Sequence, residues 1–149
     1  MSRILLLIYS IAYKLNTLKV PIIPELINKL FVRLLFGCQI GLGAKIGKNV
    51  VLGYGGLGIV IHPRSIIGDN VNIGTGVTIG GTSGKYDVPS IGDNTIISSG
   101  AKIIGPIKIG KNCVIGANAV VIHDVPNNSL VAGIPAKIIK NNIDVQEYK

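Results

Sequence analysis

The chain has 149 residues and a mass of 15.6 kDa, with 48% hydrophobic residues, 20 glycines and a net charge of +8. A mean hydropathy of +0.53 with only 15% charged residues excludes intrinsic disorder, and the length fits one folded domain. The lysines and arginines are scattered and only 5% of residues are aromatic, unlike a nucleic-acid-binding surface. We therefore expect a folded domain with no nucleic-acid partner.

Residues 1–39 form the first predicted segment, a helical cap. They are predicted to form two helices separated by VPIIP, where Pro21 and Pro24 break one helix and start the next. The apolar run from Ile4 to Tyr13 is ten residues long, shorter than the roughly 18–20 needed to cross a bilayer. No small-x-small cleavage site follows it. We expect neither a membrane span nor a secretory signal here.

The second predicted helix carries one apolar stripe, formed by Leu26, Ile27, Leu30, Phe31, Leu34 and Leu35. Such a stripe usually packs on its own protein, and we expect it to cover the open end of the fold that follows. The alternative is peripheral docking of these helices on a membrane surface, which the +4 net charge of residues 1–39 favours.

A repeat with a period of six organises the middle of the chain, apart from two longer intervals. Thirteen aliphatic residues mark it, namely Ile40, Ile46, Leu52, Ile61, Ile67, Ile73, Ile79, Ile91, Ile97, Ile103, Ile109, Ile115 and Val121. Glycine follows nine of them, and the fourth position after each is usually small or β-branched, as at Cys113. Each unit is predicted to form one short parallel strand and one turn, with its aliphatic side chain inside and three units closing a triangular coil.

This repeat resembles that of the hexapeptide acyltransferases, whose fold is a left-handed parallel β-helix. The predicted fold is therefore an all-β solenoid, with a left-handed parallel β-helix over residues 40–126 and a short N-terminal α-helical segment. Residues 127–149 are predicted to form a closing segment and tail, because VPNNSLVAGIPAKII is typical of the family's ending.

Two runs narrow the resemblance to one branch, GLGIVIHPRSIIGDNVNIGTGVTIGG and SSGAKIIGPIKIGKNCVIGANAVVIHDVPNNSLVAGIPAKII. They are similar to the serine acetyltransferases and to their short relatives that acetylate polysaccharide sugars. The resemblance implies an acetyl-CoA-dependent O-acetyltransferase that uses no metal and works as a homotrimer, with active sites in grooves between subunits. The acceptor it implies is a hydroxyl of serine or of a sugar.

The family's cofactor groove matches small turn residues and two lysines in this chain, namely Gly80, Gly81, Ser99, Ala117, Gly133, Pro135, Lys137 and Lys140. Small residues let a pantetheine arm approach backbone amides, and Lys137 or Lys140 would meet a CoA phosphate. The fold needs small turns and solvated lysines in any case, and the two interpretations stay open.

The acceptor side departs from the serine enzymes. Where they have an Asp-His pair this chain has Gly53-Tyr54, their partner aspartate falls at Gln39, and their later Arg-His falls at Asp87-Val88. We expect Tyr54, Gln39 and Asp87 beside the acceptor, while the departures leave serine specificity in doubt.

His62 is the candidate general base, since it replaces an expected turn glycine of the repeat. Transfer to a hydroxyl requires a group of near-neutral pKa to take the proton as the thioester is attacked, and histidine meets that requirement. A turn histidine without chemistry would give the same IHPRSIIG string. His123 is expected to be a solvent-facing turn residue.

The few metal-ligating residues are dispersed. Cys38 and Cys113 lie far apart, without ligand spacing, and His62 and His123 are the only histidines. The pattern predicts neither a zinc site nor a disulfide, disfavours a metal-dependent β-helix enzyme, and suits a reducing compartment such as the cytoplasm. The competing hypothesis is a trimeric β-helix assembly module without catalysis, which the missing Asp-His pair favours.

Overall fold

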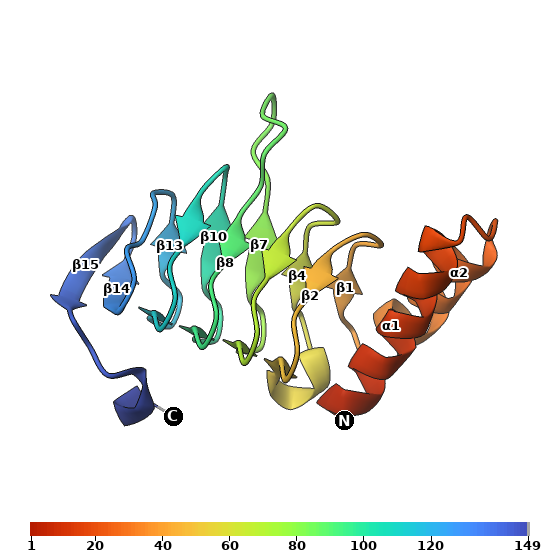
Figure 1. Cartoon of the computed structure of the whole chain (residues 1–149), viewed down its shortest axis with the longest axis horizontal. Helices are drawn as coiled ribbons and strands as arrows, with labels where there is room; N and C mark the ends of the chain where they lie inside the picture. The colour runs from red at the N-terminus through yellow and green to blue at the C-terminus, as the bar shows by residue number, and fades with distance from the viewer. Residues whose placement is uncertain (149) are drawn as a thin grey trace.

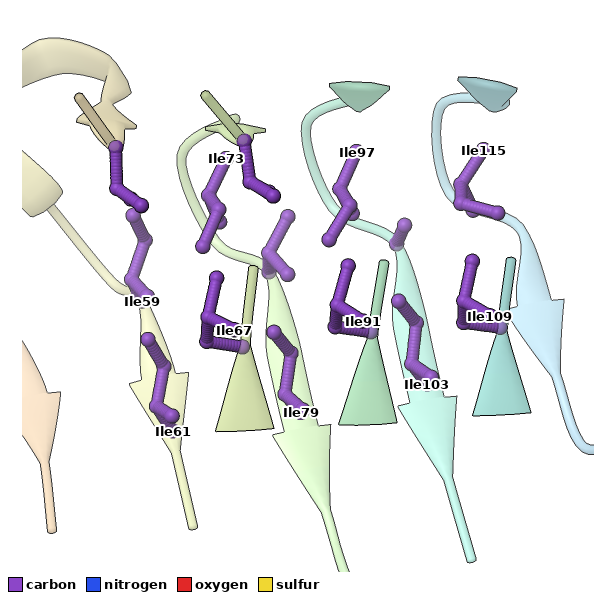
Figure 2. Packing of buried hydrophobic residues seen from close by; sticks show 14 of the residues in the cluster. Ile59, Ile61, Ile67, Ile73, Ile79, Ile91, Ile97, Ile103, Ile109 and Ile115 are labelled. Carbon is purple, nitrogen blue, oxygen red and sulfur yellow. The ribbon is translucent and has the colours of Figure 1, made fainter. Parts of the chain in front are cut away.

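The aliphatic residues of the six-residue repeat all belong to one narrow interior column. In the computed structural model, which describes residues 1–148, twelve of the thirteen are at most 3% exposed, and Ile46 in the first coil is half-buried. Figure 2 shows them in three rows along the solenoid, for example Ile61, Ile79 and Ile103. The chain winds as a left-handed parallel β-helix behind N-terminal helices (Figure 1), which confirms the predicted fold class.

Three parallel sheets form the faces of the prism. Face 1 contains β1 (Gln39–Ile40), β4 (Val60–Ile61), β7 (Thr78–Gly80), β10 (Lys102–Ile104) and β13 (Val120–Val121). Face 2 contains β2 (Lys45–Ile46), β5 (Ile66–Ile67), β8 (Ser90–Ile91) and β11 (Lys108–Ile109). Face 3 contains β3 (Val51–Leu52), β6 (Asn72–Ile73), β9 (Ile96–Ile97), β12 (Val114–Ile115), β14 (Ser129–Gly133) and β15 (Ala136–Asn141).

The parallel register places each repeat residue directly over its counterpart in the next coil. Ile61 pairs with Ile79 and Ile79 with Ile103. The fourth-position residues are also buried, including Ser65, Thr95 and Cys113, each at 0% exposure. The prediction that Cys113 is a small core residue is confirmed. β15 alone runs antiparallel, against β14, and ends the third face; the short helix η3 (Val145–Tyr148) follows it.

Two interruptions of the repeat become projecting turns. The longer step after Leu52 holds the 3-10 helix η2 (Gly53–Gly56), in which Tyr54 adopts a left-handed backbone conformation with φ 49°. The segment between β7 and β8, residues 81–89, extends outward as the long loop at the top of Figure 1. The outward loop predicted from its turn residues is confirmed.

Helix α1 (Ser2–Thr17) packs on the first coil through Leu5, Tyr9 and Ala12, which are buried. The Tyr9 hydroxyl donates to the carbonyls of Gly41 at 3.0 Å and Ala44 at 2.8 Å. These contacts tie the helix to the open end of the solenoid. Among the described residues, no helix is long and apolar enough to cross a membrane.

The predicted packing of the second apolar stripe is wrong. The segment folds as α2 (Ile23–Ile27) followed by the π-helix η1 (Asn28–Leu35). Its inner face is spaced by four residues, namely Pro24, Asn28, Val32 and Phe36, while the stripe residues Leu26, Leu30, Phe31, Leu34 and Leu35 are 46–78% exposed. The wider π-helical turn explains the difference, because it rotates residues off the face that an α-helical spacing assigns to them.

An asparagine ladder lines the edge between faces 2 and 3, here called the asparagine edge. Its five residues share a left-handed backbone, with φ between 54° and 58°: Asn49, Asn70, Asn94, Asn112 and Asn128. Each side-chain amide donates to the next at 2.9–3.1 Å. Asparagine suits this edge because it tolerates the left-handed region and bonds along the stack.

We predict that Asn94→Ala lowers the free energy of unfolding by about 2–3 kcal/mol, since it removes two ladder hydrogen bonds and places a Cβ-bearing apolar residue in the left-handed region. Asn94→Gly keeps the backbone conformation and should cost about 1 kcal/mol less. Urea unfolding measures both. Asn72→Ala, on a strand outside the ladder and equally half-buried, is the matched control; equal losses for Asn94→Ala and Asn72→Ala would contradict the role of the ladder.

Candidate functional site

The predicted site residues occupy two edges of the prism, on either side of face 1. His62, Gly81 and Asp87 lie in turns between faces 1 and 2, here called the His62 edge, and Gly80 ends β7 at this edge. The turns between faces 3 and 1, here called the Tyr54 edge, hold Tyr54, Ser99 and Ala117. Gln39 lies on face 1 itself, in β1. One protomer therefore does not bring all of these residues together.

His62 is positioned by the register between β4 and β7. Its backbone N–H donates to the Ile79 carbonyl at 2.9 Å, so its side chain projects at the corner beside the end of β7. A Cβ built on Gly81 would lie 3.8 Å from Cδ2 and 3.9 Å from Nε2 of His62, and 3.1 Å from a methyl of Val88. The absence of a side chain at Gly81 thus leaves the backbone of this turn close to the imidazole.

The surroundings of His62 favour the neutral form of its ring. Partial burial lowers the pKa of the imidazole below its ordinary value, and the positive charge of Arg64 lowers that pKa further. Nδ1 accepts a hydrogen bond from the Arg64 backbone N–H at 3.1 Å. A neutral ring in this position therefore carries its proton on Nε2, the nitrogen beside Gly81.

Arg64 is a site residue that the sequence reasoning missed. Its guanidinium donates to the Tyr86 carbonyl from Nε at 3.0 Å and from a terminal nitrogen at 2.6 Å, and it lies 4.3 Å from the centroid of the Tyr86 ring. These contacts fasten the 81–89 loop to the His62 turn. The IHPRSIIG string contains the arginine, but its partner lies 22 residues away, where no local pattern points to it.

The contacts between Arg64 and Tyr86 are here called the clasp. A groove of about 430 Å³ opens beside it, on the side of face 2. Lys45, Arg64 and Asp87 line it together with other residues of the 81–89 loop and of face 2. Asp87 is exposed there. The groove combines two cations and one carboxylate with backbone polar groups, which suits a small polar ligand.

The Tyr54 edge holds the other candidates in a wide, exposed arrangement. Tyr54 is 84% exposed, while Gly56 in the same turn is buried and a Cβ there would meet Leu5 at 2.9 Å. Ser99 and Ala117 are exposed in successive turns along the edge, where the Asn118 N–H donates to the Ser99 carbonyl at 3.0 Å. These turns present small side chains and accessible backbone.

The closing segment supplies the remaining candidates. Gly133, with φ 99°, ends β14, Pro135 lies in the connection to β15, and both are exposed. Lys137 and Lys140 are exposed on β15. Gly80 and Gly81 lie on the other edge, so the eight predicted cofactor residues do not line one groove of a single protomer.

His123 is exposed in the turn after β13, on the His62 edge but three coils further along. Within residues 1–148, no three histidine, cysteine, aspartate or glutamate side chains gather into a metal-binding group. Cys38 and Cys113 are both buried free thiols.

Comparison with known proteins shows which family and which enzymes this chain is similar to. Residues 89–123 match the family model described as bacterial transferase hexapeptide (six repeats). The chain is 46% identical over 137 residues to the serine acetyltransferase of Staphylococcus aureus strain Mu50, which covers 90% of this chain and 63% of that protein. The chain therefore spans less than two thirds of the length of this relative.

Solved structures agree with the sequence relationship. A soybean serine acetyltransferase complexed with serine has a TM-score of 0.84 at 33% identity, covering 89% of this chain and 54% of that one. A serine acetyltransferase in complex with CoA has a TM-score of 0.83 at 33% identity, covering 91% of this chain and 55% of that one. The predicted resemblance to this branch of the hexapeptide-repeat proteins is confirmed.

We predict that Arg64→Gln loosens the 81–89 loop. Losing the hydrogen bonds to Tyr86 should raise the rate of trypsin cleavage after Lys85 by about fivefold to tenfold, the factor that roughly 1–1.5 kcal/mol supplies. Mass spectrometry of timed digests locates the cut. Lys48→Gln removes an equal charge on the asparagine edge and should leave the rate unchanged; the same rate in Arg64→Gln and the unaltered protein would rule out the clasp.

Proposed function

The chain is a hexapeptide-repeat relative of the serine acetyltransferases, and we propose that it transfers an acetyl group from acetyl-CoA to a hydroxyl of a small acceptor. The observation that carries the proposal is the 46% identity to a serine acetyltransferase, which extends over 90% of the chain and so includes both candidate edges. The fold neighbour in complex with CoA supports acetyl-CoA as the donor.

We assign the proton transfer to His62. As the acceptor oxygen attacks the thioester carbonyl carbon, the imidazole takes the hydroxyl proton. The tetrahedral oxyanion then collapses, the carbon–sulfur bond breaks, and the imidazolium returns its proton to the CoA sulfur, which leaves as the thiol. The products are an acetyl ester and CoA. Backbone N–H groups of the glycine turn beside His62 are suited to stabilise the oxyanion.

The hydrogen bond from the Arg64 N–H sets a condition on this role. With Nδ1 as an acceptor, Nε2 carries the proton of the neutral ring and is a donor. To accept the hydroxyl proton at Nε2, the ring must first move its own proton to Nδ1 and give up the Arg64 bond. That hydrogen bond contributes about 1 kcal/mol, which substrate binding can offset.

A homotrimer would unite the two edges. Face 1 separates them, and its outward side chains are mostly uncharged, including Val60, Thr78 and Val120. In a cyclic trimer, neighbours that meet along this face bring the Tyr54 edge of one subunit toward the His62 edge of the next. The acceptor pocket would then combine His62 and Asp87 of one subunit with Tyr54 and Gln39 of its neighbour.

Acetyl-CoA fits the residues that remain. The small turn residues Ser99, Ala117 and Gly133 leave backbone accessible to a pantetheine arm. Lys137 and Lys140 on β15 are exposed cations for the CoA phosphates. In the assembled trimer, Gly80 and Gly81 of the facing subunit would close the groove at the thioester end.

Serine and a sugar are the two candidate acceptors, and different observations favour each. The names of the relatives favour serine. Gly53-Tyr54, in the turn where those enzymes are expected to carry their Asp-His pair, favours a different acceptor, and a sugar hydroxyl used in polysaccharide biosynthesis is the alternative. Two buried free thiols fit a cytoplasmic enzyme.

The test is release of CoA from acetyl-CoA by the purified chain, with serine and then a panel of bacterial sugars. His62→Ala should lower the rate by about 10²–10⁴-fold, the usual contribution of a general base, without changing the particle mass in sedimentation. His123→Ala is the matched control. If His62→Ala retains full activity, His62 is not the base; if no acceptor is acetylated and acetyl-CoA does not bind, the chain is the noncatalytic assembly module instead.

The pH dependence gives a second prediction. Because burial and Arg64 lower the pKa of His62, kcat/KM should be flat at neutral pH and fall only below the ordinary histidine range, as the ring gains a proton. Arg64→Gln removes the neighbouring charge, raises that pKa and should move the acid limb to higher pH. Lys48→Gln should leave it in place. If the acid limb stays at the same pH in Arg64→Gln, the ionisation seen in the profile is not that of His62.

A further inference from the structure

Helix α1 is apolar on two sides. Leu5, Tyr9 and Ala12 face the solenoid and are buried. Ile4, Leu7 and Ile11 follow the spacing i, i+3, i+7 and are 47–62% exposed, so they form a second stripe about 130° around the helix from the first. The half-buried Leu6, Ile8 and Tyr13 add to the packing of this inner side, whereas Ile4, Leu7 and Ile11 remain exposed.

The second helical segment repeats this feature beside it. α1 and α2 lie side by side at the N-terminal end of the solenoid (Figure 1). The exposed apolar residues here are Ile22, Ile23, Leu26, Leu30, Phe31, Leu34 and Leu35, between 46% and 79% exposed. Together with the outer stripe of α1 they form the apolar cap surface. Apolar surface gathered at this density on one end of a protein marks an interaction site.

The charges among these residues identify the partner. Arg3, Lys14, Lys19, Lys29 and Arg33 are all exposed, and Glu25 is the only acid in residues 1–39. Glu25 is itself paired with Lys29 at 3.5 Å. On α1, Arg3 and Lys14 both flank the outer stripe, at positions where their ammonium or guanidinium groups can reach beyond its edge. The cap surface therefore combines exposed apolar side chains with an excess of exposed cations.

This combination argues against a second copy of the chain as the partner. Two such surfaces face to face would bring like charges together, with one acid per chain to compensate. The partner must cover apolar side chains and also carry negative charge. A bilayer with anionic headgroups does both, because its interface accepts shallow apolar side chains while its phosphates attract lysine and arginine.

We propose that the N-terminal helices dock the protein on an anionic phospholipid surface, lying in the interface without crossing it. The helices are too short to span, in agreement with the absence of a candidate span among the described residues. Docking through this end leaves the later coils of the solenoid open to solvent. The proposal is independent of the acetyl-transfer function.

The test is sedimentation of the full chain with vesicles of phosphatidylcholine alone or mixed with phosphatidylglycerol. Binding to the mixed vesicles should be at least about tenfold tighter and should weaken with salt. Leu7→Glu, which places an acid in the outer stripe, and Lys29→Gln with Arg33→Gln, which removes cations and leaves the apolar residues intact, should each weaken it by about tenfold or more.

Ile139→Glu is the matched control, since Ile139 is 57% exposed on β15 at the opposite end of the solenoid; it should bind like the unaltered protein. Circular dichroism of each variant checks the fold. Equal binding to both kinds of vesicle, or no binding by a folded chain, would overturn the proposal. So would a smaller particle mass for Leu7→Glu, which would make the cap surface a contact between copies.

Discussion

Each two-residue strand of the solenoid contributes one inward side chain, and the stacking of that side chain on its counterparts in neighbouring coils holds the structure together. Ile79 lies between Ile61 and Ile103 in register and is completely buried. Full burial of one such side chain contributes about 1.5–3 kcal/mol, but only when coils exist on both sides. The stability of the solenoid therefore comes from contacts between neighbouring coils, so strands of only two residues are sufficient.

An interior filled by aliphatic side chains leaves only the edges and outer faces for chemistry. The asparagine edge is not free to bind a ligand, because its side-chain amides hydrogen-bond to one another along the ladder. The other two edges are where the repeat is interrupted, by the Tyr54 turn and by the 81–89 loop. The two insertions flank face 1, so a single chain does not bring them together in one site.

The period of six was sufficient to predict the fold because it constrains every coil in the same way. Other features depend on contacts that no short pattern contains. The exposure of Leu30 and Leu34 follows from π-helical winding, which an α-helical spacing cannot anticipate. The asparagine ladder did have a signal, since its asparagines follow Gly-Lys or Gly-Asp in four of five turns. The clasp between Arg64 and Tyr86 joins residues 22 positions apart and needed the structure.

The partner of Arg64 matters for the chemistry as much as for the loop. A carboxylate in contact with the guanidinium would offset its charge and so remove the smaller of the two causes that lower the pKa of His62. The Tyr86 carbonyl and ring hold the guanidinium without cancelling that charge. The ion pairs of residues 1–148 lie elsewhere, at Lys29–Glu25 and Lys111–Asp93. Arg64 thus fastens the loop and, together with burial of the ring, lowers the pKa of the neighbouring imidazole.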